Sequence, residues 1–146
     1  MSKLVALLIA ALSGVTMAVQ GTANSRLAEK TSLWESTFLV HLVGTIIVGV
    51  IMLVFGVGGF RPNKWFSVPW YLYIGGVLSV LIIYLVAASI PRVGVCNATT
   101  AIIVGQVAAA CIIDHLGLFG VEKIVWNYTK LIGIALFAVG AKLLLN

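Results

Sequence analysis

Residues 34–57 read WESTFLVHLVGTIIVGVIMLVFGV, and no Asp, Glu, Lys or Arg follows Glu35 in this stretch. A transmembrane helix needs about 20 consecutive apolar residues, so this segment predicts a helix that crosses a bilayer. The rest of the chain has the same character. Of its 146 residues 62% are hydrophobic and 9% charged, whereas soluble domains carry about 25% charged residues. The sequence therefore predicts an integral membrane protein in which no separate soluble domain fits.

Four further apolar runs accompany this one, and short polar or Gly- and Pro-containing breaks separate them. The breaks fall at residues 21–33, 58–68, 90–94 and 117–125. The predicted transmembrane helices are residues 2–22, 34–57, 69–89, 93–115 and 126–145. Every backbone N–H and C=O is then satisfied within its own helix, as the bilayer core demands. The predicted fold is an all-α membrane protein with a single five-helix domain over residues 1–146.

The first apolar run, after Lys3, could be mistaken for a secretory signal peptide. No Ala-x-Ala cleavage site is evident at residues 16–20, and the run is longer than a signal peptide requires. We therefore interpret it as the first helix of the mature protein.

Aromatic side chains and prolines support the helix map. Tyr and Trp prefer the membrane interface, and only Tyr84 lies deep in a predicted span. The aromatic residues at or near predicted helix ends are Trp34, Trp65, Trp70, Tyr71, Tyr73, Trp126 and Tyr128. Pro62, Pro69 and Pro91 fall at breaks or first turns, where a missing N–H does no harm.

No pattern in the sequence indicates an enzyme, a metal site or a cofactor. The thiols of Cys96 and Cys111 are fifteen positions apart, about 22 Å along one helix, so they cannot pair with each other. Neither has a metal-ligand partner at the usual spacing, and no phosphate-binding loop or activated nucleophile appears. The net charge of +5 is ordinary for anchoring at anionic headgroups, and nothing indicates nucleic acid.

Loop charges do not fix the orientation of the chain in the membrane. The basic residues on the side of the N-terminus are Lys3, Arg61, Lys64, Lys123 and Lys130, and those on the opposite side are Arg26, Lys30, Arg92 and Lys142. Orientation follows the asymmetry of Lys and Arg in short loops. A balance of five against four is compatible with insertion in both directions. A fixed topology, decided by a margin of one charge or by the first helix, remains an equal alternative.

Polar residues form stripes on two of the predicted helices, because residues three or four apart share a helix face. On the first helix the stripe is Ser13, Thr16, Gln20 and Asn24, beside a strip of small residues that includes Gly14 and Ala18. On the fourth helix Thr99 and Gln106 share a face with Asp114 at its edge, and the small-residue face includes Ala101, Gly105 and Ala109. Small faces permit close helix packing.

Polar side chains that face lipid are unfavourable, so Gln20, His41 and Gln106 should face the protein interior or a water-filled cavity. Two interpretations compete. The groups either hold the helices together by hydrogen bonds, each worth about 0.6 to 2 kcal/mol, or they line a substrate pathway. His41 favours the second, since it is the one ionisable group clearly inside a span and can exchange a proton near neutral pH. Asp114 could bind a cation. Glu35 is a further candidate for ion coupling, although at a helix end water and headgroups satisfy it.

Several short motifs resemble one known family over nearly the whole chain. They are Pro69-Trp70-Tyr71, Gly75-Gly76, the run 90–94 (IPRVG), Gly105-Gln106 and the run 114–118 (DHLGL), with Gln20, Asn24 and Leu27 matching the first helix. This pattern resembles the bacterial YdcZ-like family. Its members are half-size relatives of the drug/metabolite transporter superfamily, which includes the small multidrug resistance transporters and the ten-helix EamA-type permeases.

The resemblance implies one inverted-repeat unit of a transporter in the bacterial inner membrane. Ten-helix relatives consist of two five-helix repeats in opposite orientation, and inverted repeats are a usual scaffold for alternating access. A single five-helix copy must find its partner in another chain, either a second copy in antiparallel orientation or a second half-size homologue. This chain lacks the Glu deep in the first helix of small multidrug resistance transporters, where Ser13, Thr16 and Gln20 stand instead.

The sequence therefore predicts a secondary transporter of small metabolites or organic cations that works as a dimer with a pathway near the bilayer midplane. Gln20, His41 and Gln106 are its predicted pathway residues, with Asn24, Thr99, Ser13 and Thr16 beside them and His41, Asp114 and Glu35 as candidates for ion coupling. A small dual-topology ion channel and a non-transporting structural or regulatory subunit are the alternatives.

Overall fold

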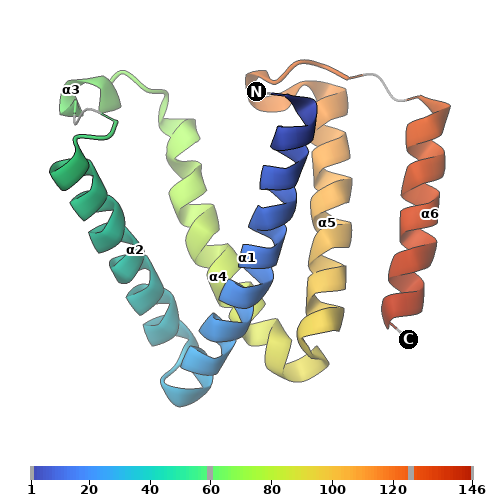
Figure 1. The fold of residues 1–146 in the computed structure, drawn as a ribbon, viewed down its shortest axis with the longest axis horizontal. Helices are drawn as coiled ribbons and strands as arrows, with labels where there is room; N and C mark the ends of the chain where they lie inside the picture. Colours follow the sequence, from blue (N-terminus) through green and yellow to red (C-terminus); the bar gives the residue numbers. More distant parts are fainter. Residues whose placement is uncertain (1, 59–60, 125–126, 146) are drawn as a thin grey trace. The chain divides into compact units, whose positions relative to one another are not determined.

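The structure, a computed structural model, describes residues 2–58, 61–124 and 127–145 (Figure 1). These ranges contain five helices long and apolar enough to cross a membrane, and they contain no β-strand. The predicted all-α, five-helix fold is thereby confirmed. The chain divides into two compact units, Met1–Arg92 and Val93–Asn146. The union of the two in a single domain stays a prediction.

The first helix, α1 (Lys3–Lys30), is longer than predicted. The sequence placed its end at residue 22 because the following residues are polar. Those residues nevertheless continue the helix for eight positions, about 12 Å at 1.5 Å per residue. Arg26 and Glu29 form an ion pair of 2.8 Å one turn apart within this extension. Polarity marks where a helix leaves the lipid and does not mark where its hydrogen bonds end.

Only Thr31 and Ser32 separate α1 from α2 (Leu33–Phe55). The hydroxyl of Ser32 accepts a hydrogen bond from the N–H of Glu35 at 3.2 Å and so caps the new helix. The carboxylate of Glu35 lies in the first turn, where the positive end of the helix dipole favours it. At the other end α2 stops at Gly56, whose left-handed φ of 62° suits a residue without a Cβ.

The connection from α2 to the next span contains two short helical turns, the first within the predicted break at 58–68 and the second within the predicted helix at 69–89. They are α3 (Pro62–Trp65) and the 3₁₀ turn η1 (Trp70–Tyr73), which leads directly into α4 (Ile74–Val93). The hydroxyl of Tyr73 donates to the backbone oxygen of Trp65 at 2.7 Å, so it ties the two turns together. Figure 1 shows α3 at the end of α2 that lies away from the 31–32 turn.

The predicted break at residues 90–94 is wrong in extent. Pro91 lies inside α4, which continues to Val93, and α5 begins at Val95. Gly94 alone separates the two, with a φ of 82° that favours glycine. Pro91 is compatible with the helix because it lies within its last turn, where the loss of one N–H interrupts little of the hydrogen-bond ladder.

The second unit contains α5 (Val95–Leu116), the short turn η2 (Leu118–Gly120) and α6 (Tyr128–Leu145), and α5 contacts α6. The N–H of Ile124 donates to the backbone oxygen of Asp114 at 2.9 Å, which folds the segment after η2 back onto the end of α5. The predicted start of the last helix at residue 126, and the interfacial Trp126, lie outside the described residues.

The burial pattern is the reverse of that of a water-soluble bundle. In the most apolar window of each of the five helices, no more than 11% of the residues are buried. The buried residues are small or polar for the most part, whereas the large apolar side chains are exposed. Lipid or another protein chain must cover those side chains, as expected of helices that span a membrane.

Candidate functional site

Helices α1, α2 and α4 converge near the 31–32 turn (Figure 1). A Cβ on Gly21 of α1 would lie 2.9 Å from Cγ1 of Val86 in α4, so these helices approach as closely as a glycine permits. The hydroxyl of Ser36 in α2 donates to the backbone oxygen of Asn24 in α1 at 3.1 Å. Ser36 is fully buried, and Asn24 is buried with it. Glycine packing and a hydrogen bond thus hold three spans together at one end.

The imidazole of His41 joins α2 to α4 within their spans. Its Nδ1 lies 2.8 Å from the backbone oxygen of Thr37, and its Nε2 lies 3.0 Å from Oγ of Ser79. The hydroxyl of Ser79 also lies 2.8 Å from the backbone oxygen of Gly76. We call this set, from Thr37 O through His41 and Ser79 to Gly76 O, the histidine bridge. It lies three residues from Gly44 at the middle of α2, about 4.5 Å along the axis.

The partners of the histidine bridge decide which atoms carry protons. A carbonyl oxygen only accepts, so Nδ1 of His41 must carry a proton toward Thr37. The hydroxyl of Ser79 has one proton and two neighbouring acceptors. If the hydroxyl donates to Nε2, the ring is neutral, and if it donates to the oxygen of Gly76, Nε2 must donate and the ring is an imidazolium. Rotation of one hydroxyl therefore gives each charge state of His41 a complete set of hydrogen bonds.

An aromatic contact lies beside the bridge, toward the 31–32 turn. The rings of Trp34 in α2 and Tyr84 in α4 lie with their centroids 4.7 Å apart at an angle of 40°. Trp34 precedes His41 by seven residues, whereas Tyr84 follows Ser79 by five, as antiparallel helices require. The contact fixes the register of α2 against α4 and so positions the imidazole opposite Ser79.

Two predicted pathway residues satisfy their hydroxyls within their own helix. Ser13 donates to the backbone oxygen of Ala10 at 2.7 Å, and Thr16 donates to that of Leu12 at 2.9 Å. A hydroxyl that bonds to its own helix in this way needs no partner in the protein interior. Ser13 and Thr16 are exposed in the single chain.

The remaining predicted pathway residues belong to both units. Gln20 in α1 and Gln106 in α5 are exposed, whereas Thr99 is half-buried in α5. Of the candidates for ion coupling, Glu35 is exposed at the start of α2 and Asp114 is half-buried near the end of α5. The structure joins Asn24 to Ser36 and His41 to Ser79. The meeting of both units' residues in one pathway stays a prediction.

The predicted packing faces lie largely uncovered in the single chain. A Cβ on Gly14 or on Gly105 would meet no atom within 4 Å among the described residues. Ala101 and Ala109 are exposed, and Ala18 is half-buried. The helix contacts that the structure shows on α1 are at Gly21, one turn beyond Ala18, and at Asn24, which accepts from Ser36 of α2. A packing role for the other small residues stays a prediction that concerns surfaces available to a partner.

Sequence reasoning missed Ser79, Ser36 and the pairing of Trp34 with Tyr84. A signal for Ser79 was present, because it is the one hydroxyl residue between Tyr73 and Tyr84 in an otherwise apolar run. Its partner could not be found from spacing, since 38 positions separate it from His41.

A family model described as "Putative inner membrane exporter, YdcZ" matches residues 5–143, which is nearly the whole chain. The chain belongs to the YdcZ family. The resemblance of its short motifs is thus confirmed, and with it a transporter of the bacterial inner membrane with several spans. No curated protein and no solved structure matches this chain. The family is one of exporters, which is not an enzyme class.

Proposed function

We propose that this YdcZ-family chain is one half of a secondary transporter that exports small metabolites or organic cations in exchange for protons. The histidine bridge carries the proposal. An ionisable side chain near the middle of a span is energetically unfavourable, so its presence there indicates a function. The hydrogen bonds among His41, Thr37, Ser79 and Gly76 accommodate both charge states of the imidazole. His41 is accordingly the proton carrier of the proposed exchange.

The proposal includes an antiparallel dimer with alternating access. Three observations support it: an odd number of spans in the described residues, nearly balanced loop charges, and the exposure of Gln20 and Gln106 in the single chain. Amide side chains are costly in lipid, so a second chain that covers them stabilises the assembly. Two five-helix units of opposite orientation reproduce the inverted repeat that alternating access uses. A second half-size homologue would serve the same purpose as a second copy.

Transport in proteoliposomes tests the role of His41. The purified chain is reconstituted, and uptake of a panel that includes tetraphenylphosphonium, choline and neutral amino acids is measured with and without a pH gradient. We expect accumulation of at least one compound to depend on the gradient. His41→Gln should reduce that accumulation at least tenfold but preserve exchange of labelled for unlabelled compound, because glutamine hydrogen-bonds without titrating.

Ser79→Ala is the matched variant, because it breaks the same contact between α2 and α4 but keeps the imidazole. If His41 only joined the helices, His41→Gln and Ser79→Ala would reduce exchange and accumulation alike. That result would contradict the proton-carrier role. Flux of many ions per second without exchange would instead identify a channel. Unchanged flux in both variants, with copurification of a larger partner, would identify a structural or regulatory subunit.

Tagging of the C-terminus tests the antiparallel dimer separately. Reporters specific for the cytoplasm and for the periplasm are fused after the last helix. The proposal expects signal from both sides, since the loop charges favour neither orientation. Signal from one side alone would contradict the antiparallel homodimer and leave pairing with a homologue of opposite orientation as the form to test.

A further inference from the structure

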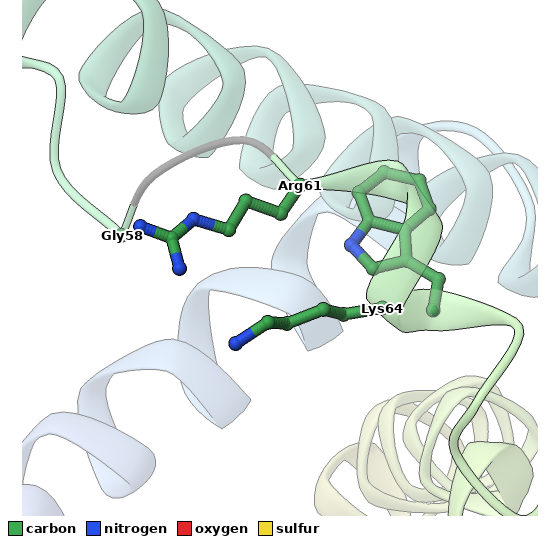
Figure 2. A pocket seen from close by; sticks show the side chains of 4 residues that line it. Gly58, Arg61 and Lys64 are labelled. Atoms are coloured by element: carbon green, nitrogen blue, oxygen red, sulfur yellow. The ribbon is translucent and has the colours of Figure 1, made fainter.

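The connection between α2 and α4 contains a hollow that the proposed transport function does not use. Its volume is about 420 Å³, and it is lined by Gly58, Arg61, Lys64 and Trp65. Figure 2 shows the side chains of Arg61, which precedes α3, and of Lys64, within α3, extended in the same direction; both line the hollow. A guanidinium group and an ammonium group therefore border the same hollow.

Three backbone carbonyls of this connection already have hydrogen-bond donors other than the two cations. The oxygen of Arg61 accepts from the N–H of Lys64, and the oxygen of Lys64 accepts from the N–H and the hydroxyl of Ser67. The oxygen of Trp65 accepts from the hydroxyl of Tyr73 and the N–H of Val68. These three carbonyls therefore already accept hydrogen bonds from nearby N–H and hydroxyl groups. The same hydrogen bonds hold the backbone of the α3 turn in place and so position the side chains of Arg61 and Lys64.

Within the described ranges, no ion pair joins Arg61 or Lys64 to an acidic side chain. The chain has four acidic residues, and the ion pair found within the described ranges joins Glu29 to Arg26, in α1. Gly58 adds a wall without a side chain, and its φ of 83° is a conformation that other residues rarely adopt. The hollow therefore combines two cationic side chains with a glycine that leaves space beside them. Such a site can bind an anionic oxygen group such as a phosphate.

Trp65 lines the hollow, and the aromatic residues Phe66 and Trp70 follow it in the chain. Trp65 is 50% exposed, Phe66 90% and Trp70 83%, although all three are large apolar side chains. Exposed tryptophans at the ends of spans lie at the headgroup level of a bilayer. The hollow follows the end of α2 and precedes the span that begins at Trp70, so it lies at that level too. This is the depth of the phosphate groups of phospholipids.

We propose that Arg61 and Lys64 bind the phosphate group of an anionic phospholipid in this hollow, with Trp65 against the adjoining lipid. The chemistry, two cations around a phosphate, would also accept free inorganic phosphate. The interfacial depth and the exposed aromatic residues favour the lipid. The inference is independent of the transport mechanism, since it involves neither His41 nor the amide side chains.

The full chain, purified in detergent and stripped of lipid, provides the test. Native mass spectrometry measures retention of added phosphatidylglycerol, with phosphatidylcholine and inorganic phosphate as the comparison probes. The variants are Arg61→Gln with Lys64→Gln, and a control of Lys3→Gln with Lys130→Gln. The control removes the same charge from the same predicted side of the membrane, so any effect of charge balance on topology is matched.

We expect the wild type and the control to bind phosphatidylglycerol equally and to prefer it to phosphatidylcholine. The Arg61→Gln, Lys64→Gln variant should bind it at least tenfold more weakly, since it loses two direct charge-assisted contacts to the phosphate, which the control keeps. Equal losses in both double variants would overturn the site, because nonspecific attraction would then suffice. Displacement of the lipid by millimolar inorganic phosphate would overturn its assignment to a lipid.

Discussion

The first unit and the second unit hold their spans together by different means. In the first, α1, α2 and α4 are joined by named polar contacts: Ser36 to Asn24 and His41 to Ser79. In the second, α5 contacts α6 near Ala141 and Thr100, which are buried beside an apolar hollow of about 460 Å³. Lipid offers no hydrophobic drive for helices to associate, so close packing and hydrogen bonds must provide it. The polar contacts named for the first unit include the contact between His41 and Ser79 on which the proposed chemistry rests.

The largest effect is expected where α1 approaches α4. Gly21→Leu places a side chain where even a Cβ would lie 2.9 Å from Val86, so we expect a loss of about 3 kcal/mol in unfolding free energy. Unfolding in mixed detergent micelles measures it. Gly14→Leu in the same helix is the control, because its Cβ meets no described atom. Equal losses in the two variants would contradict the role of Gly21 as the contact point.

Removal of the buried hydroxyl of Ser36 should come next. Ser36→Ala breaks the bond to the oxygen of Asn24, and we expect a loss of about 1 kcal/mol, because a typical intramolecular hydrogen bond contributes that much. Ser89→Ala removes a hydroxyl that bonds only within its own helix, to Val86, and should have a smaller effect. The same unfolding measurement compares them. If Ser89→Ala lowers the unfolding free energy as much as Ser36→Ala does, the hydrogen bond between α1 and α2 stabilises the protein no more than a bond within one helix.

A double-mutant cycle on Trp34 and Tyr84 measures the contact that sets the register of α2 against α4. We expect a coupling free energy of about 0.5 to 1 kcal/mol, as for aromatic pairs in other proteins. Trp34→Leu, Tyr84→Leu and the double variant are unfolded under identical conditions. Additive effects would mean that the two rings at 4.7 Å do not stabilise each other.

The smallest effect is expected in the second unit. A Cβ on Gly140 of α6 would meet no described atom within 4 Å, so Gly140→Ala should change the unfolding free energy by less than about 0.5 kcal/mol. A loss as large as that of Gly21→Leu would show that α6 packs as closely as α1, and the contrast between the units would fail.

The sequence predicted most of the fold because the membrane imposes a simple length and polarity rule. Runs of about 20 apolar residues and aromatic residues near their ends sufficed to find all five spans. It misjudged the end of α1 and the position of Pro91 in α4. In both places hydropathy reported where the lipid ends, whereas helix geometry depends on backbone hydrogen bonds that continue into water.

The candidate site was predicted in part. His41 was singled out as an ionisable group inside a span, and the structure gives it a partner on another helix, Ser79, that neither its own helix face nor its spacing reveals. Ser13 and Thr16, in contrast, formed a convincing polar stripe but donate to their own helix. A periodic pattern shows which side chains share a face and does not show what they bond to.

By itself, the sequence determined the five spans, the membrane location, the family and the presence of a histidine within a predicted span. Only the tertiary structure decided that Ser79 faces His41, that Gly21 meets Val86, and that Arg61 and Lys64 share one hollow with Gly58. The physical reason is that burial in lipid depends on local composition. A hydrogen bond between two helices depends instead on their register and rotation, which packing along the whole helix pair sets.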